Sequence, residues 1–459
     1  MTQMKLAIQP YIQPGRRVHL SGIGGVSMCP LAEVLHGMGL QVQGSDMSDS
    51  ATVEHLRSLG IPVHVGHVAQ DIQGAEFLIR TAAIHDDNPE IAAARAHGIP
   101  VFERAEAWGA IMQQYENALC IAGTHGKTTT TSMSTHIFMA AEKDPTVMIG
   151  GTLPMLHSGY RVGRGDTIIL ESCEYCNSFL HFFPTVAVIL NVEADHLDFF
   201  KDLADVEHSF RAFAQLVPPE GHVVANADDP GVREALEGID RFSFGLEAPE
   251  ADCRGVNLRW DHGLPSFDVV ICGQVYTHLD LQVGGKHNVY NALAAASAAY
   301  LLGIPGGAVK AGLEAFTGAG RRFEYKGEYN GAKVYDDYAH HPGELHALLD
   351  MARGLGYERI VCAFQPHTYS RTKALFDEFV QELRRPDVLI LAEIYAAREK
   401  NTIGITSADL AREIPGAICC PTLEAVTDAL AQAARPGDLI LTVGAGDIYT
   451  AGEALVRRR

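Results

Sequence analysis

Residues 118–131 read Ala-Leu-Cys-Ile-Ala-Gly-Thr-His-Gly-Lys-Thr-Thr-Thr-Thr, an apolar strand that runs into a glycine loop and then a threonine-rich helix. Glycines let the backbone bend tightly, so that successive N–H groups face one phosphate, and the helix adds the positive end of its dipole. Lys127 offers a charge to the outer phosphates, and the Thr128 hydroxyl offers a ligand to magnesium. The stretch therefore predicts a nucleotide-phosphate site.

The loop is shorter than the usual phosphate-binding pattern. The position of that pattern's first glycine is Ile121 here, so the match is to Gly123-x-x-Gly126-Lys127-Thr128. A simple turn and helix cap is the alternative interpretation, but the apolar run before the loop and the threonines after it favour phosphate binding. The expected contacts are Gly123, Thr124, His125, Gly126, Lys127, Thr128 and Thr129.

Length and composition narrow the class of protein. A chain of 459 residues suggests about three domains. The net charge of −20 argues against nucleic acid or an anionic membrane as a partner. No charge-free apolar run reaches ~18 residues, and the N-terminal sequence does not resemble a secretion signal. Nine cysteines lie scattered without a disulfide framework, and only Cys173 and Cys176 form a C-x-x-C pair, so we expect a cytoplasmic protein.

Three segments differ in pattern. Residues 1–115 open with a strand at 17–20, a glycine loop at 22–25, a helix, and a second strand ending at Asp46. This order is typical of a dinucleotide-binding, Rossmann-like unit, although Ser27 occupies the position of the third glycine. Further alternation of strands and helices predicts a doubly wound parallel sheet.

The other two segments are also α/β. Residues 116–317 contain the phosphate loop, apolar strands at 167–171 and 186–191, and an antiparallel-looking stretch over 242–281. Residues 318–459 alternate strands with helices, one of them expected over 372–383. The predicted fold class is therefore α/β in three domains: an N-terminal Rossmann-like domain, a central P-loop ATPase-like domain and a C-terminal Rossmann-like domain.

Two acidic or histidine-bearing sites follow strands of the central segment. Glu171 ends one strand, and Asn191-Val192-Glu193-Ala194-Asp195-His196 leaves another. Because the carboxyl ends of parallel strands open on one edge, Glu171 and His196 are candidate ligands for magnesium. Glu171 as a carboxylate at a helix N-terminus and His196 as a backbone-bonded loop histidine remain the alternatives.

Later motifs carry amide, arginine and histidine side chains. Asn288 and Asn291 lie one helical turn apart and suit a purine edge, although by themselves they favour an ordinary helix cap. Arg321 and Arg322 in a glycine turn suit a phosphate or a carboxylate. Two loops that follow strands then bring three histidines and an arginine, which is more than surface loops without a task explain. These loops read Asp336-Asp337-Tyr338-Ala339-His340-His341-Pro342 and Phe364-Gln365-Pro366-His367-Thr368-Tyr369-Ser370-Arg371.

Taken together, these motifs resemble the Mur ligase family, the ATP-dependent amide-forming ligases of peptidoglycan synthesis. The resemblance covers essentially the whole chain, and the shortened phosphate loop is usual in this family. The motifs Asp337-Tyr338-Ala339-His340-His341-Pro342 and Phe364-Gln365-Pro366-His367 most resemble the alanine-adding branch. The resemblance further rests on Gly22-Ile23-Gly24-Gly25, Gly44-Ser45-Asp46, Gly123 to Thr130, Asn191 to His196, His287-Asn288 and Arg321-Arg322-Phe323.

The resemblance implies a function and its residues. The implied activity is ATP-dependent ligation of L-alanine to the carboxylate of UDP-N-acetylmuramate through an acyl phosphate, with two Mg²⁺ ions. The implied sites are Gly22, Gly24, Gly25 and Asp46 for the UDP-sugar; Asn288, Arg322 and Asp337 for the rest of ATP; Thr128, Glu171 and His196 for the metal; and Lys127, His340, His367 and Arg371 for catalysis and the amino acid. It leaves open whether His340 or His367 accepts the amine proton, and gives no expectation for the oligomeric state.

Departures and rival functions qualify this interpretation. Where some relatives carry Glu-Ala-Asp-Glu, this chain reads Glu171-Ser172-Cys173-Glu174, which keeps both outer acids. Arg211 replaces the modified lysine of several sister ligases, so we expect no carbamylated lysine, and Thr368 replaces an arginine, which leaves Arg371 as the carboxylate anchor. The nearest rival is a ligase that attaches a recycled tripeptide to the same UDP-sugar. A nicotinamide-dependent oxidoreductase and a non-catalytic nucleotide-binding regulator are the rivals from other classes.

Overall fold

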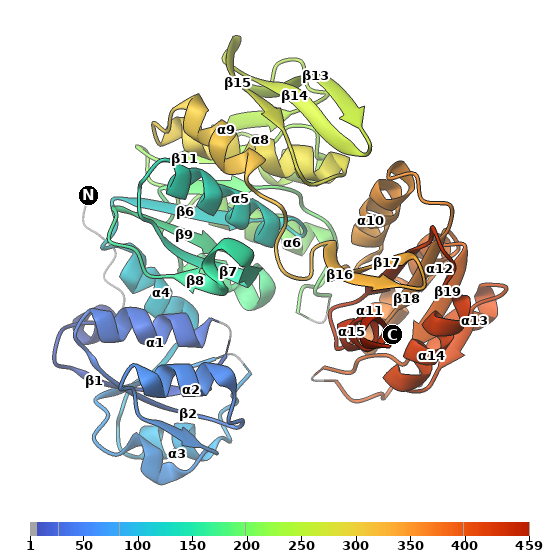
Figure 1. Ribbon diagram of the computed structural model, residues 1–459. Helices are drawn as coiled ribbons and strands as arrows, with labels where there is room; N and C mark the ends of the chain where they lie inside the picture. The colour runs from blue at the N-terminus through green and yellow to red at the C-terminus, as the bar shows by residue number, and fades with distance from the viewer. Residues whose placement is uncertain (1–6, 26, 82, 198, 398, 459) are drawn as a thin grey trace.

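Three β-sheets follow one another along the chain in the computed structural model, which describes residues 7–458 except 26, 82, 198 and 398. Figure 1 shows the N-terminal part in blue, the central part in green and yellow, and the C-terminal part in orange and red. Within the described residues, no helix has both the length and the apolar character needed to cross a membrane.

The first sheet is parallel throughout, as the sequence predicts, and its strand order is β3-β2-β1-β4-β5. Its apolar strands and helices bury side chains such as Leu20, Phe77 and Leu35. The strands are β1 (Arg17–Ser21), β2 (Gln41–Asp46), β3 (Val63–Val65), β4 (Phe77–Arg80) and β5 (Val101–Glu103); the helices are α1 (Met28–Gly37), α2 (Ala51–Ser58), α3 (Pro89–Ala96) and α4 (Arg104–Met112).

The central sheet has ten strands in the order β15-β14-β13-β12-β11-β10-β6-β9-β7-β8. Strand β10 is buried over its whole length, which is typical of a parallel strand covered by helices on both faces. Helix α5 packs against α8 and α9 on one face. The strands are β6 (Asn117–Ala122), β7 (Thr146–Leu153), β8 (Ser158–Arg161), β9 (Thr167–Glu171), β10 (Val186–Ile189), β11 (His222–Asn226), β12 (Phe242–Gly245), β13 (Cys253–Asp261), β14 (Leu264–Ile271) and β15 (Gln274–Asp280); the helices are α5 (Lys127–Ala140), α6 (Leu203–Ala214), α7 (Pro230–Ala235), α8 (Lys286–Leu301) and α9 (Gly306–Glu314).

The antiparallel region predicted over 242–281 is only partly so. Strands β13, β14 and β15 do form an antiparallel meander. Strand β12 pairs in parallel with both β11 and β13 and so extends the parallel part of the sheet. Alternating burial along β14 shows that a sheet with one solvated face begins only beyond β12.

The third sheet runs β16-β17-β21-β18-β19-β20, with one antiparallel pair, β16 and β17, at its edge. The single helix predicted over 372–383 is two helices, because Leu375 leaves the helical conformation at φ −111°, ψ 31°. The strands are β16 (Glu324–Tyr329), β17 (Ala332–Asp337), β18 (Ile360–Phe364), β19 (Val388–Ala392), β20 (Ile418–Cys420) and β21 (Leu439–Val443); the helices are α10 (Pro342–Gly354), α11 (Tyr369–Ala374), α12 (Phe376–Leu383), α13 (Ser407–Glu413), α14 (Leu423–Ala433) and α15 (Tyr449–Arg457).

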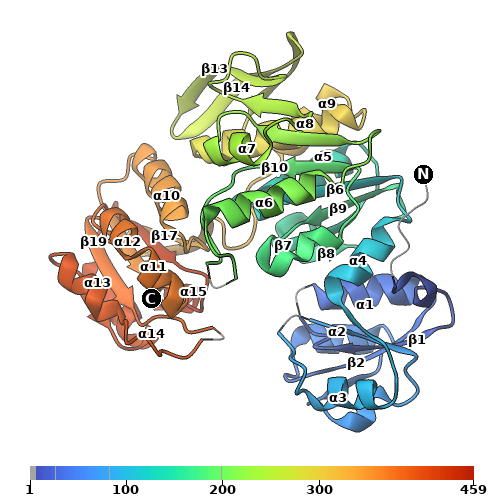
Figure 2. The ribbon, with the colours of Figure 1, turned by 180° about the vertical axis from the view of Figure 1, so that it is seen from behind.

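Helix α10 of the third part contacts helix α8 of the central part, and Figure 2 shows α10 on the side that faces the central sheet. The loops that leave β6 and β10 meet the N-terminal end of α10. The fold therefore brings the carboxyl end of the central parallel sheet against the third domain.

Candidate active site

The phosphate loop joins β6 to α5, and its glycines are required by the backbone. Gly126 has φ +81°, a conformation that favours glycine, and a Cβ at this position would lie 2.6 Å from Asn291 Oδ1. Asn191, at the end of β10, holds the loop from the other side. Its Oδ1 accepts the His125 N–H at 2.7 Å and its Nδ2 donates to the His125 carbonyl at 3.1 Å. The Asn191 side chain therefore fixes the loop from the strand that lies beside it.

Lys127 begins helix α5 and points back over the loop. Its Nζ donates to the carbonyls of Gly123 and Thr124 and lies 3.0 Å from the Glu174 carboxylate. Burial alone would lower the pKa of Lys127, but Glu174 and neighbouring acids raise it above its ordinary value. The amine is therefore a permanent cation at the mouth of the phosphate loop.

Two side chains with oxygen atoms that suit a divalent cation, Thr128 and Glu171, line the same cleft as Lys127. The Thr128 hydroxyl donates to Glu171 Oε1 at 3.2 Å, and Gly150 N donates to Glu171 Oε2 at 2.7 Å. A carboxylate and a hydroxyl are the donors that Mg²⁺ prefers, so Thr128 and Glu171 fit this ion. His196 lies elsewhere on the rim, with Nε2 3.8 Å from both Glu174 and Asp195, and burial lowers its pKa, which keeps a nitrogen lone pair available.

The residues predicted for the rest of ATP lie in one cleft of about 1420 Å³ with the phosphate loop. Asn288 and Asn291 bond each other at 3.1 Å, and Asn288 Nδ2 donates to the Gly284 carbonyl at 2.7 Å. Asp337 accepts two backbone N–H groups, from Phe323 and Ala339. Burial nevertheless raises the pKa of Asp337 to about 6. Arg322, which stacks on the Tyr338 ring at 5.2 Å, also lines this cleft.

The predicted amino-acid residues gather at the end of the third sheet. The rings of His340 and His367 are 5.8 Å apart, and Arg371 Nη1 lies 3.3 Å from His367 Nδ1. His340 lines the cleft, whereas His367 and Arg371 lie beside it. Arg371 also forms a buried ion pair with Asp195 of the central domain, at 2.9 and 3.1 Å. The structure thus brings the predicted amine side and the predicted nucleotide side together.

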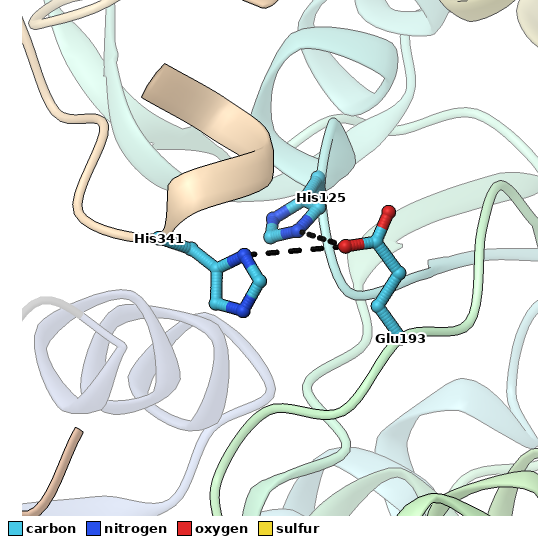
Figure 3. A group of neighbouring side chains, drawn as sticks. All are labelled: His125, Glu193 and His341. Carbon is cyan, nitrogen blue, oxygen red and sulfur yellow. Dashed lines mark hydrogen bonds and ion pairs between the residues drawn. The ribbon is translucent and has the colours of Figure 1, made fainter. Parts of the chain in front are cut away.

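A second contact between the domains centres on the His125 side chain (Figure 3). Its Nε2 lies 3.3 Å from Glu193 and its Nδ1 lies 3.2 Å from Glu344 at the start of α10. His341 approaches the same Glu193 oxygen at 3.9 Å. Burial alone would lower the pKa of His125, but the two carboxylates raise it to about 10, so the ring is an imidazolium that bridges two domains. Together, His125, Glu193 and His341 form a group with metal-ligand chemistry, but both nitrogens of His125 are occupied by carboxylates here.

The predicted UDP-sugar residues meet at the ends of β1 and β2. Gly24 N donates to Asp46 Oδ2 at 2.9 Å, and Gly22 has φ +77°. Ser27 lies at the start of helix α1, and its carbonyl accepts from Trp108 Nε1 at 3.4 Å. Gly22, Gly24, Gly25 and Asp46 thus form one loop cluster in the first domain, as the sequence predicts.

Known protein families match the chain in each of its three domains. Three families match in order: "Mur ligase family, catalytic domain" over residues 17–116, "Mur ligase middle domain" over 121–299, and "Mur ligase, glutamate ligase domain" over 321–446. The UDP-N-acetylmuramate–L-alanine ligase of Clostridium novyi is 43% identical over 450 residues, which is 97% of this chain and 98% of that protein. The chain belongs to the Mur ligase family.

Solved Mur ligase structures share the fold. The UDP-N-acetylmuramate-alanine ligase of Thermotoga maritima matches with a TM-score of 0.81 at 28% identity, over 96% of this chain and 98% of that one. The murein peptide ligase of Psychrobacter arcticus matches with a TM-score of 0.72 at 22% identity, over 96% and 98%, and shows the fold alone. The α/β fold in three domains that the sequence predicts is confirmed.

Two side chains that organise this Mur ligase site could not be singled out from the sequence. In the sequence, Asn191 is only one member of the motif that runs from Asn191 to His196. In the structure, its side chain holds the phosphate loop. Glu344 is absent from the predicted site, although it lies among three site residues: His125, Arg322 and His340. Its spacing from His341 is that of a capping box, which marks the start of a helix and was the one signal available.

Proposed function

We propose that this Mur ligase joins L-alanine to the carboxylate of UDP-N-acetylmuramate, with ATP converted to ADP and phosphate, as a step of peptidoglycan precursor synthesis. The observation that carries this proposal is that one cleft is lined by the phosphate loop of the central domain and by His340 and Arg322 of the third domain. A nucleotide site and an amino-acid site on one cleft are what ATP-driven amide formation requires. The proposed setting is the cytoplasm, where ATP and UDP-sugars are made.

The first step transfers the ATP γ-phosphoryl group to the muramyl carboxylate and gives an acyl phosphate. A carboxylate resists attack by an amine because of its charge and resonance, and phosphorylation removes both obstacles. Lys127 holds the outer phosphates and neutralises the charge that develops on the transferred group. Thr128 and Glu171 would hold Mg²⁺, with His196 as a further ligand on the same cleft, and the ion would supply further neutralisation when bound; two ions are proposed.

The second step is the attack of the alanine amine on the acyl phosphate. Arg371 and His367 bind the alanine carboxylate, because a guanidinium fork and an imidazole suit this anion. Asn288, Arg322 and Asp337 bind the adenosine part and phosphates of ATP, and the loop cluster Gly22, Gly24, Gly25 and Asp46 binds the UDP-sugar. Because the substrates are held by three domains, turnover requires the domains to close around them.

The test measures phosphate release from ATP with UDP-N-acetylmuramate and a panel of amines: L-alanine, glycine, L-serine and the tripeptide of the recycling ligases. L-Alanine is expected to stimulate release most. Preference for the tripeptide would assign the rival function, and the absence of amide product with every amine would overturn the proposal.

Lys127→Ala tests the phosphate loop directly. We expect phosphate release to fall by roughly 10³-fold or more, since a comparable cation at a transferred phosphoryl group is worth that much. UDP-sugar binding, measured by calorimetry, should stay nearly unchanged because its site is in the first domain. Lys201→Ala removes a lysine that is 87% exposed and serves as the matched control. Near-normal turnover of Lys127→Ala would refute the assignment.

A further inference from the structure

His340 has a defined proton position. Its Nδ1 lies 3.0 Å from the Tyr338 carbonyl, which only accepts, so Nδ1 carries the hydrogen. The same Nδ1 lies 3.3 Å from Glu344 Oε2. In the neutral ring, Nε2 therefore holds the lone pair, and within the part of the chain that the structure describes no residue hydrogen-bonds Nε2. His340 is thus arranged as a proton acceptor on the cleft.

His367, its neighbour, has the opposite arrangement. Its Nδ1 lies 3.3 Å from Arg371 Nη1, and an arginine only donates, so Nδ1 accepts. The neutral ring then carries its proton on Nε2. The Nδ1 lone pair of His367 is therefore taken by Arg371 and is not available for the amine proton.

Glu344 is the charged group that faces the protonated nitrogen of His340. It lies in the first turn of α10, where one oxygen accepts the backbone N–H groups of His340 and His341 at 2.9 and 3.2 Å. Its other oxygen faces His125 of the phosphate loop at 3.2 Å. Burial alone would raise the pKa of Glu344, but His340 and His125 hold it well below its usual value. A buried, ionised carboxylate therefore touches His340 on the side away from its acceptor nitrogen.

We propose that Glu344 is the positioning residue that makes His340, and not His367, the acceptor of the proton from the alanine ammonium. The Tyr338 carbonyl keeps the hydrogen on Nδ1, and the Glu344 carboxylate beside that nitrogen stabilises the imidazolium that forms when Nε2 takes up a proton, as a carboxylate does beside a catalytic imidazole. The inference rests on the proposed function, and names which of two histidines does the proton transfer.

Two protons leave the alanine nitrogen during the reaction. The ammonium of alanine gives one proton to His340 Nε2 and becomes a neutral amine. Its lone pair forms the C–N bond with the acyl carbon, and the bond from that carbon to the phosphate oxygen breaks, with the electron pair leaving on phosphate. The phosphate takes the second nitrogen proton, which leaves the amide, phosphate and an imidazolium at His340.

The charged groups around His340 come from three elements. Glu344 of α10 and Asp195 after β10 favour its protonated form, whereas Arg371 of α11 opposes it. Burial is the largest effect and lowers the pKa of His340 to about 4, so the ring enters the reaction unprotonated at neutral pH. The Tyr338 ring lies against it at 5.5 Å, and its carbonyl adds a bond to Nδ1.

The experiment compares two nucleophiles in the full-length enzyme with ATP, Mg²⁺ and UDP-N-acetylmuramate. Hydroxylamine is largely unprotonated at neutral pH and needs no base, whereas alanine does. For Glu344→Gln, we expect the alanine-dependent rate to fall about 10²-fold, within the usual range of general-base catalysis, and hydroxamate formation to stay within about threefold of wild type. The alanine rate of this variant should also recover as pH rises, because the amine loses its proton unaided. Glu424→Gln, an exposed first-turn glutamate of α14, is the matched control.

Other outcomes decide against the inference. If Glu344→Gln loses both rates equally, a second variant, His340→Gln, leaves the backbone bonds of Glu344 in place and must lose the alanine rate but keep hydroxamate formation. Equal loss of both rates in His340→Gln as well overturns the proposal. Unchanged alanine turnover in either variant also overturns it. If wild type forms no hydroxamate and no alanine amide, the proposed function itself has failed, which is a separate result.

Discussion

The buried ion pair between Asp195 and Arg371 joins the central and third domains, and Asp195→Asn tests what it contributes. Both side chains are about nine-tenths buried, and two nitrogens of Arg371 lie 2.9 and 3.1 Å from one carboxylate oxygen. At about 3 Å and an effective dielectric constant of about 20, two unit charges attract by about 5 kcal/mol. Removing one partner of a buried pair costs about 3–5 kcal/mol.

This cost falls on the contact between the domains and not on the folding of either one, because separation of the domains returns Arg371 to water. A loss of about 3 kcal/mol shifts the equilibrium between docked and separated domains by about 10²-fold. The assay is small-angle scattering with nucleotide and UDP-sugar: wild type should compact, and Asp195→Asn should stay extended under the same conditions, with a matching fall in kcat.

Asp428→Asn is the matched control, since it removes the carboxylate of an exposed pair with Arg458 inside the third domain. Exposed pairs contribute little, so this variant should behave as wild type. The reasoning would be refuted if Asp195→Asn compacted and turned over like wild type.

Two further predictions concern the cleft. Burial raises the pKa of Asp337 to about 6, from an ordinary value of 3.8. Between pH 3.8 and pH 6 the folded protein therefore binds more protons than the unfolded chain, so the contribution of Asp337 to stability falls as pH rises through this range. The melting temperature of Asp337→Asn relative to wild type should therefore increase from pH 4 to pH 7; a difference that stays constant with pH would show that burial does not raise this pKa. Gly126→Ala places a Cβ 2.6 Å from Asn291 Oδ1 at φ +81°, which costs about 1–2 kcal/mol for the backbone alone. We expect the KM for ATP to rise about tenfold, and an unchanged KM would show that the loop tolerates the side chain.

The parts of the site that the sequence predicts lie within one continuous stretch of chain or at the ends of parallel strands. The phosphate loop could be predicted because a strand, a glycine loop and a helix place Lys127 and Thr128 side by side within one continuous stretch of chain. Glu171 could be predicted because the ends of parallel strands share an edge. The structure places Thr128 and Glu171 within 3.2 Å of each other.

The parts that could not be predicted depend on distant segments. The spacing of Asn288 and Asn291 indicates one helix face, but not that Asn291 accepts a hydrogen bond from Thr130 of helix α5. Glu344 looks like an ordinary capping residue until the third domain lies against the phosphate loop. The helix predicted over 372–383 was wrong at Leu375, because no glycine or proline in the sequence marks the break in the backbone there.

The phosphate loop contacts the third domain through the His125 side chain, in addition to its proposed contact with nucleotide. The backbone that is to hold the nucleotide belongs to the same short loop as the side chain that touches Glu344 of the third domain. Thermodynamic linkage makes the two events reciprocal. If bound nucleotide changes the docking equilibrium of the third domain by some factor, docking changes the affinity for nucleotide by the same factor. Under the proposed function, an amino acid that binds only when the third domain is docked would act as an effector of ATP binding, although the two ligands need never touch.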